Sequence, residues 1–98
     1  MDHERATAVA RRISAGHAYE KHVVEGYDFP EIKSREELAA VIFEVLTDPA
    51  SLKRGLRDGR EAFWNERHRV LVILDLLSED CGTALRPTTG RTYFRGLR

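Results

Sequence analysis

The strongest constraint on the fold of this chain is a short apolar run past its midpoint. Residues 70–74 read Val-Leu-Val-Ile-Leu, and three of these five side chains are β-branched. Such residues favour β-strands, and a strand without a polar position is buried on both faces of its sheet. The run therefore predicts a strand within a sheet that is covered on both sides.

Two more strands are expected in the same half. Residues 62–64 are bulky and apolar, and the polar residues 65–68 separate them from the run, which predicts a hairpin. A polar turn at 78–82 precedes a third predicted strand at 83–86. The last segment, 91–97, fits either a strand or a short helix.

The first half has helical periodicity instead. Apolar residues such as Val9 and Ile13 recur three and four positions apart, which predicts helix over residues 3–25. Gly26 is a plausible end, since glycine enters the left-handed terminal conformation at low cost. Gly16 weakens the middle, so two shorter helices meeting near it are equally compatible with the pattern.

A second helix is predicted over residues 35–47, where the apolar positions again lie on one face. Ser34 and Glu37 form a capping box at its start, because the hydroxyl and the carboxylate can each accept an unpaired backbone N–H. Residues 51–57 are expected to add one short turn of helix.

These elements predict an α+β fold in which N-terminal helices pack on a small C-terminal antiparallel β-sheet. The 98 residues suffice for a single domain, 1–98, with a helical part over about 3–57 and a sheet part over about 61–97.

Composition excludes several classes of protein. Cys81 is the only cysteine, which excludes an internal disulfide framework and a cysteine-based zinc site. No apolar stretch approaches the ~20 residues that a membrane helix requires, so no membrane partner is expected, and the N-terminus leads into no apolar signal segment.

The charge is zero overall but unevenly distributed. Residues 1–49 carry a balance of −4 and residues 50–98 a balance of +4, and 13 of the 16 basic residues are arginine. Zero net charge argues against a nonspecific nucleic-acid coat, whereas a basic half that lines a cleft is compatible with a local phosphate site.

The first group of chemically competent residues is His17, Lys21 and His22. His17 and Lys21 lie four apart, on one face of a helix, whereas His22 lies about 140° around from His17 on a straight α-helix. A bend near Gly16 would bring all three to one cleft. A zinc site is disfavoured, because the histidines are five apart and no third ligand is near. Cys81 is flanked by acidic residues, which disfavour a reactive thiolate.

The second group lies in residues 82–94, which are rich in hydroxyl, guanidinium and glycine residues. Arginine supplies a fork of donors, each threonine supplies one, and glycine lets a backbone N–H approach, so this segment suits the binding of an oxyanion. Imidazole, ammonium and hydroxyl groups together suit phosphoryl transfer to or from RNA without a metal or other cofactor.

The order of these motifs resembles a known group. Gly16-His17-x3-Lys21-His22-Val23, an amphipathic helix and a terminal Thr/Arg/Tyr segment are similar to the C-terminal ribonuclease domains of bacterial polymorphic toxins. These include contact-dependent growth-inhibition toxins with a ribonuclease A-like fold and the group with a barnase, EndoU, colicin and RelE-like core.

The resemblance implies metal-independent cleavage of RNA, with tRNA as one candidate, to give a 2′,3′-cyclic phosphate. It implies that His17 or His22 acts as acid or base and that Lys21 holds the phosphate. It assigns Thr83, Arg86 and Thr89 as further phosphate ligands and Tyr93 as an assisting donor. It also implies a cognate immunity protein and action in the bacterial cytoplasm, after delivery within a larger secreted protein.

A non-enzymatic binding module remains the alternative. In that hypothesis, an immunity, antitoxin or scaffold protein uses the arginine-rich C-terminal half to bind an acidic surface. A DNA-reading protein is disfavoured, because the helix predicted over 35–47 carries Glu36, Glu37 and Glu44 against one arginine.

Overall fold

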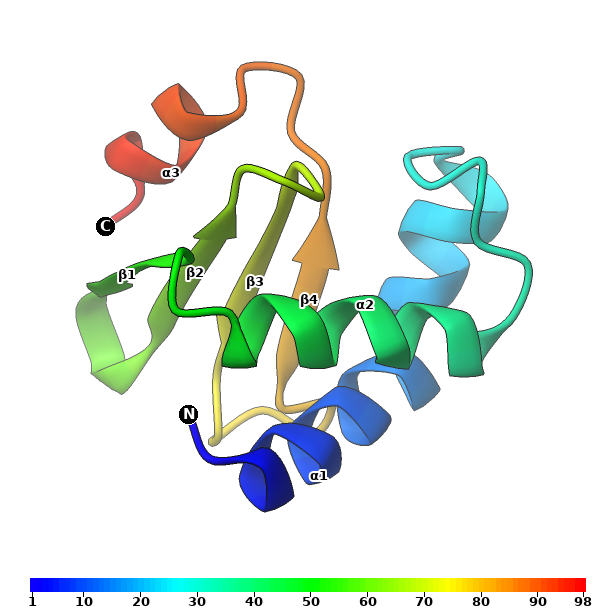
Figure 1. Ribbon diagram of the computed structural model, residues 1–98, viewed down its shortest axis with the longest axis horizontal. Coiled ribbons are helices and arrows are strands. Elements are labelled where there is room, and N and C mark those ends of the chain that lie inside the picture. Colours follow the sequence, from blue (N-terminus) through cyan, green and yellow to red (C-terminus); the bar gives the residue numbers. More distant parts are fainter.

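Four strands form one antiparallel sheet in the computed structural model, which describes residues 1–98 (Figure 1). The strands are β1 (Leu52–Gly55), β2 (Glu61–Asn65), β3 (Val70–Leu74) and β4 (Gly82–Leu85), and they are paired in chain order. In the register, Trp64 lies opposite Leu71, and Ile73 lies opposite Thr83. The α+β fold with a C-terminal antiparallel sheet is confirmed.

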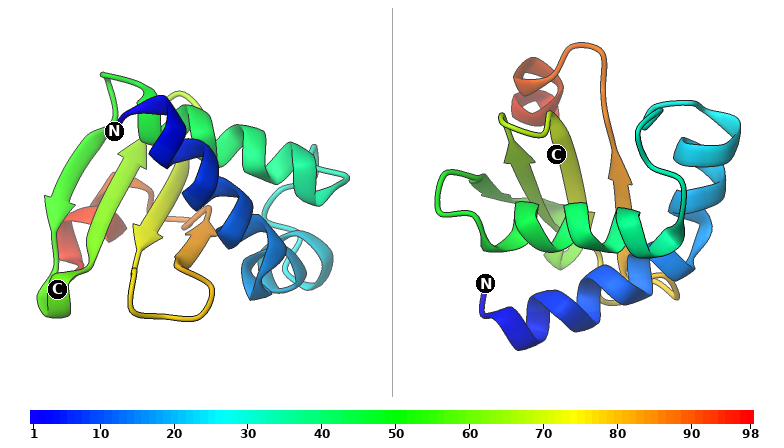
Figure 2. Two further views of the ribbon diagram at one scale, coloured as in Figure 1. Left: turned by 90° about the horizontal axis from the view of Figure 1, so that it is seen from below. Right: turned by 45° about the vertical axis from the view of Figure 1, so that its right-hand side comes forward.

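Helices cover both faces of this sheet. The helices α1 (His3–Ala15) and α2 (Arg35–Thr47) pack against each other on one face, and the short helix α3 (Arg91–Gly96) lies on the other (Figure 2). Residues 91–97, for which the sequence fits either a strand or a short helix, therefore contain a helix. None of the helices is long and apolar enough to cross a membrane.

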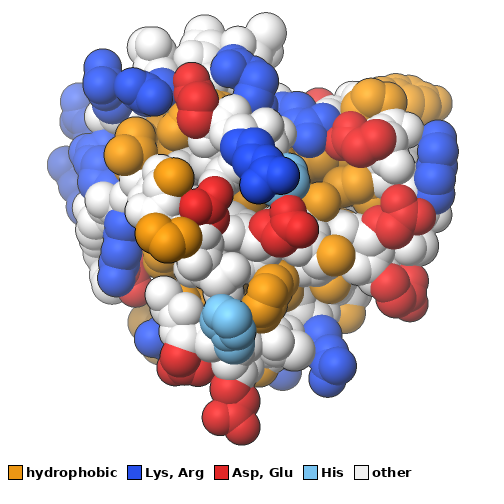
Figure 3. All heavy atoms as spheres, viewed as in Figure 1, with side chains coloured by type: hydrophobic (Ala, Val, Ile, Leu, Met, Phe, Trp, Pro, Cys, Tyr) orange, Lys and Arg blue, Asp and Glu red, His pale blue; other side chains and the backbone are white.

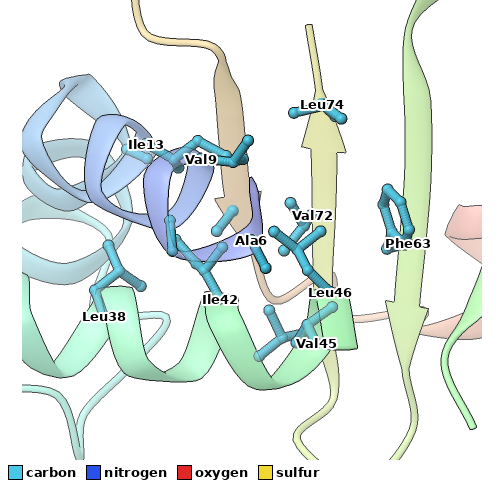
Figure 4. Packing of buried hydrophobic residues seen from close by; sticks show 14 of the residues in the cluster. Ala6, Val9, Ile13, Leu38, Ile42, Val45, Leu46, Phe63, Val72 and Leu74 are labelled. Carbon is cyan, nitrogen blue, oxygen red and sulfur yellow. The ribbon is translucent and has the colours of Figure 1, made fainter. Parts of the chain in front are cut away.

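The larger part of the core lies between the two N-terminal helices and the sheet (Figure 4). It is built from aliphatic and aromatic side chains of α1, α2 and the inner face of the strands, among them Ile13, Ile42, Phe63, Val72 and Leu74. Each of these side chains is at most 5% exposed. Burial at this level stabilises the fold by about 1.5–3 kcal/mol for each large side chain.

A smaller core lies on the opposite face of the sheet. Trp64 and Leu71 are fully buried there, and Phe94 of α3 packs against them. The indole nitrogen of Trp64 donates a hydrogen bond of 2.6 Å to Glu66, so burial leaves no unpaired donor. Both faces of β3 are therefore covered, as its continuous apolar sequence predicts.

The prediction of a helical turn over 51–57 is wrong, because this segment contains the edge strand β1 and then a short 3-10 turn, η2 (Arg57–Gly59). Pairing with β2 makes this segment a strand. Lys53 lies opposite Phe63, and the Lys53 ammonium is 3.0 Å from the carboxylate of Glu61. Charged residues are common on edge strands, where they oppose aggregation, and they hide the alternation that would mark a strand.

The predicted helix over 3–25 is divided at Gly16, as one of the two alternatives anticipated. α1 ends at Ala15, and a π-helix, η1 (Tyr19–Glu25), follows. A Cβ atom at Gly16 would lie 2.5 Å from Cγ of Asp80, so glycine makes room for that carboxylate. α2 has the predicted bounds, and the Ser34 hydroxyl accepts the N–H of Glu37 at 3.1 Å.

Candidate functional site

A cavity of about 340 Å³ lies between η1, strand β4 and helix α3. Five of the seven predicted site residues line it: His17, Lys21, His22, Thr83 and Tyr93. They come from three elements that are far apart in the sequence, and the fold brings them together.

His17 lies at the junction of α1 and η1, where a carboxylate of the β3–β4 loop holds its ring. The Nδ1 atom of His17 is 2.6 Å from Oδ2 of Asp80, and the backbone N–H of His17 donates to the same oxygen at 3.2 Å. This hydrogen bond, together with the negative charge of Asp80, raises the pKa of His17 and lowers the pKa of Asp80. The pair favours the imidazolium form, whose Nε2 carries a proton that it can donate.

His22 has a similar arrangement at its own Nδ1 atom. Oδ2 of Asp28, in the loop after η1, lies 2.8 Å from that nitrogen, and the His22 side chain is largely buried. A carboxylate at Nδ1 fixes the orientation of the ring and leaves Nε2 for a reactant. The cavity is therefore lined by two imidazoles, each held by an aspartate.

The two histidines lie on either side of a change in helix type. On a straight α-helix, their five-residue spacing would place them about 140° apart. His17 instead precedes the π-helix, which begins at Tyr19, and His22 lies within it, so no continuous α-helix joins them, and both line the cavity. π-Turns are rare and are concentrated at functional sites.

The remaining lining groups are donors without strong partners. Lys21 is exposed and takes part in none of the ion pairs of the chain. Thr83 and Leu85 of β4 line the cavity, whereas Ala84 between them is buried in the core of the other face. Tyr93 is 43% exposed on α3. One ammonium and two hydroxyl groups thus border the space beside the imidazoles.

Gly82 sets the start of β4 and so the position of Thr83. Its φ of +135° disfavours any residue with a side chain, and a Cβ atom there would overlap the carbonyl oxygen of Ile73. This close approach of two backbones is what allows the edge strand to begin at the cavity wall.

Arg86 and Thr89 do not line the cavity. The guanidinium of Arg86 donates to the carboxylate of Glu31 at 2.7 Å and to the carbonyl oxygens of Asp28 and His68 at 3.1 Å each. It also lies over the ring of Phe29, 4.6 Å from its centroid. Arg86 therefore fastens the loop after η1 to the end of β4.

Thr89 is exposed in the turn before α3, and its carbonyl oxygen accepts the N–H of Thr92. It lines none of the cavities that contain His17 or His22, so nothing in the geometry of the cavity supports a role for it as a phosphate ligand.

Two functional residues escaped the sequence reasoning, namely Asp80 and Asp28. Asp80 is 63 residues from the histidine that it holds, and Asp28 is six residues from His22. Neither spacing is a recognisable motif. The one available signal for Asp80 was its place two residues before Gly82, in a turn that leads into a predicted strand.

A second cavity of about 490 Å³ adjoins the first and shares His17, Asp80 and Thr83 with it. Its further lining includes Arg60 at the start of β2 and the loop residue Glu79. No group of three or more His, Cys, Asp or Glu side chains is placed to hold a metal ion.

The chain matches no model of a known protein family and no curated protein sequence.

Proposed function

We propose that this chain is a metal-independent endoribonuclease domain of the toxin type, which cleaves RNA by attack of a 2′-hydroxyl on the adjacent phosphate. The observation that carries the proposal is the pair of aspartate-held imidazoles, His17 and His22, in one cavity with Lys21. Two imidazoles can supply both the base and the acid that this reaction requires at neutral pH.

The reaction assigns a separate task to each histidine. Nε2 of His22 removes the proton of the 2′-hydroxyl, and the 2′-oxygen forms a bond to phosphorus. Nε2–H of His17 then protonates the departing 5′-oxygen as its bond to phosphorus breaks. The products are a 2′,3′-cyclic phosphate and a free 5′-hydroxyl. His17 is assigned as the acid because the hydrogen bond and the negative charge of Asp80 raise its pKa and favour the imidazolium form.

The negative charge that develops on the phosphate needs fixed donors around it. The ammonium of Lys21 supplies a full positive charge, and the hydroxyls of Thr83 and Tyr93 supply hydrogen bonds. The three side chains come from η1, β4 and α3, the elements that border the cavity.

The substrate, the inhibitor and the place of action that we propose are those implied by the resemblance to the ribonuclease domains of polymorphic toxins. tRNA is the candidate substrate, an immunity protein is the expected inhibitor, and the bacterial cytoplasm is the expected place of action. The competing hypothesis is a non-enzymatic module whose arginine-rich C-terminal half binds a protein partner.

The test compares the wild-type chain with the double variant His17→Ala/His22→Ala on total tRNA in the presence of EDTA. His3→Ala is the matched control, because His3 is an exposed histidine outside the cavity that contacts the edge of Phe43. We expect cleavage by the wild type and the control, with 2′,3′-cyclic phosphate ends, and none by the double variant.

Equal cleavage by the wild type and a folded double variant, or no cleavage by either at micromolar concentration, would refute the proposal. In the latter case, a partner that co-purifies with the chain and does not depend on the two histidines would favour the protein-binding hypothesis.

A further inference from the structure

Five arginines form a continuous basic surface, here called the basic ridge: Arg54, Arg57, Arg60, Arg95 and Arg98. None of them takes part in an ion pair, in contrast to Arg35, Arg86 and Arg91. Figure 3 shows Lys and Arg side chains gathered along the upper left edge of the molecule, over β1 and α3, with an acidic side chain among them, and further basic and acidic side chains at the centre and right.

Hydrogen bonds show that these arginines are neighbours. Arg54 donates to the carbonyl oxygen of Arg95 at 2.6 Å, and Arg60 donates to the carbonyl oxygens of Arg98 at 2.6 Å and Arg57 at 3.2 Å. Arg54 and Arg60 thus tie the C-terminal segment to the β1–β2 hairpin. The side chains of Arg57, Arg95 and Arg98 donate no hydrogen bond within the protein and are exposed, so they are free to bind a ligand.

The basic ridge begins at the candidate site. Arg60 lines the adjoining cavity together with His17 and Thr83, which also line the first cavity. The adjoining cavity also contains the carboxylates of Asp75, Glu79 and Asp80, so Arg60 is its cationic side chain on the ridge side. The hydrogen bonds of Arg60 to Arg57 and Arg98 connect this cavity to the rest of the ridge.

We propose that the basic ridge binds the phosphate backbone of single-stranded RNA on one side of the scissile linkage. The direction of the strand, from the cavity over Arg60 toward Arg57 and Arg98, rests on the proposed function. A single strand is favoured because a linkage held between η1, β4 and α3 must be splayed out of a duplex. Arginine suits this task, since its planar group binds phosphate through two parallel hydrogen bonds.

The test measures binding without cleavage. The probe is a fluorescently labelled 2′-O-methyl RNA of about ten nucleotides, which cannot undergo 2′-hydroxyl attack and whose length is typical of single-strand sites. Its anisotropy is followed over a range of salt concentrations with the wild type and with Arg57→Gln/Arg95→Gln/Arg98→Gln.

The matched control is Arg5→Gln/Arg11→Gln/Lys33→Gln. It changes the net charge by the same amount, and it replaces exposed side chains on α1 and on the loop before α2 that form no ion pair. Circular dichroism and thermal unfolding verify that both triple variants fold.

We expect the slope of log K against log salt to fall by about 0.7 for each lost phosphate contact, and hence by about 2 in the ridge variant. The control should retain the wild-type slope. Equal losses in both variants, or no loss in either, would overturn the ridge as the RNA path. Tighter binding of a poly-glutamate peptide than of the RNA would also overturn it, in favour of an acidic protein partner.

A cleavage assay with the same proteins distinguishes failure of this inference from failure of the proposed function. If the RNA binds through the ridge but the wild type cleaves nothing, the ribonuclease proposal fails and the ridge stands as a surface for RNA. If the wild type cleaves a dinucleotide and a longer RNA equally well, and the ridge variant does the same, the ridge fails and the ribonuclease proposal stands.

Discussion

Arg86 gives the sharpest test of the difference between sequence and structure, because the two assign it opposite tasks. As a phosphate ligand, it would contribute to RNA binding and little to stability. In the structure, its guanidinium holds the carbonyl oxygens of Asp28 and His68 and the carboxylate of Glu31. Since Asp28 also holds His22, Arg86 is expected to act on the site as a positioning residue.

The cost of Arg86→Met can be worked out from these contacts. Hydrogen bonds from a charged donor contribute about 1.5–3 kcal/mol each, and the two carbonyl bonds belong at the low end because a quarter of the Arg86 side chain is exposed. The half-exposed Glu31 adds at most about 1 kcal/mol, and stacking on Phe29 adds about 0.5 kcal/mol. The total is about 3.5–4.5 kcal/mol, which corresponds to a Tm lower by about 14–36 °C for a domain of this size.

Thermal and urea unfolding of Arg86→Met, Arg86→Lys and Arg91→Met provide the assay. Arg91 is the control, since its ion pair with Glu66 is long, at 3.8 Å, and exposed, so that its loss should cost less than ~1 kcal/mol. Arg86→Lys should recover less than half of the loss, because one ammonium cannot reach both sides of the fork. An Arg86→Met protein as stable as Arg91→Met would refute this reasoning and restore Arg86 as a free phosphate ligand.

An activity measurement on Arg86→Lys below its melting temperature separates the two tasks further. A positioning residue that acts through Asp28 should lower kcat and change the pH profile of cleavage, because the ring of His22 loses its fixed orientation. A phosphate ligand should raise KM and reduce the salt dependence, with the pH profile unchanged.

Three further substitutions test single features of the fold. Asp80→Asn should reduce stability most between pH 3.8 and 6.5, the ordinary pKa values of Asp80 and His17. The contribution of the pair is lost as the pH falls through the lowered pKa of Asp80 and as it rises through the raised pKa of His17, which urea unfolding at a series of pH values would show. Gly82→Ala should cost more than about 2 kcal/mol because of its positive φ and the clash with β3, whereas Gly59→Ala, with open space at φ +74°, should cost about 1 kcal/mol in the same urea assay. Ser34→Ala should cost about 1 kcal/mol through the loss of the α2 cap, as measured by thermal unfolding.

The parts of the fold that the sequence predicts correctly are those with local causes. Ser34 and Glu37 determine the start of α2 within one turn, and the β-branched, apolar run 70–74 favours a buried strand. β1 has no such local cause, because Lys53 is held by pairing with a strand later in the chain. For α3, the burial of Phe94 against the outer face of the sheet decides between helix and strand, and this contact is tertiary.

The charged residues of the candidate site also divide into those that the sequence reveals and those that only tertiary contacts reveal. The reactive types His17, Lys21 and His22 stand out in the sequence because they are chemically unusual and close together. Their carboxylate partners do not, since an aspartate in a loop resembles any other until the fold brings it to an imidazole. Arg86 illustrates the converse, because composition cannot distinguish an arginine that binds a ligand from one that fastens a loop.

The five-residue spacing of the histidines is where local periodicity misleads most. At 100° per residue, His17 and His22 point in different directions, and the same spacing disfavours a zinc site on an α-helix. The chain instead ends α1 at Ala15, the Asp80 carboxylate occupies the space that a side chain at Gly16 would need, and a π-helix begins at Tyr19. The same carboxylate also raises the pKa of His17. The segment from His17 to His22 is therefore not a continuous α-helix, and both imidazoles line one cavity.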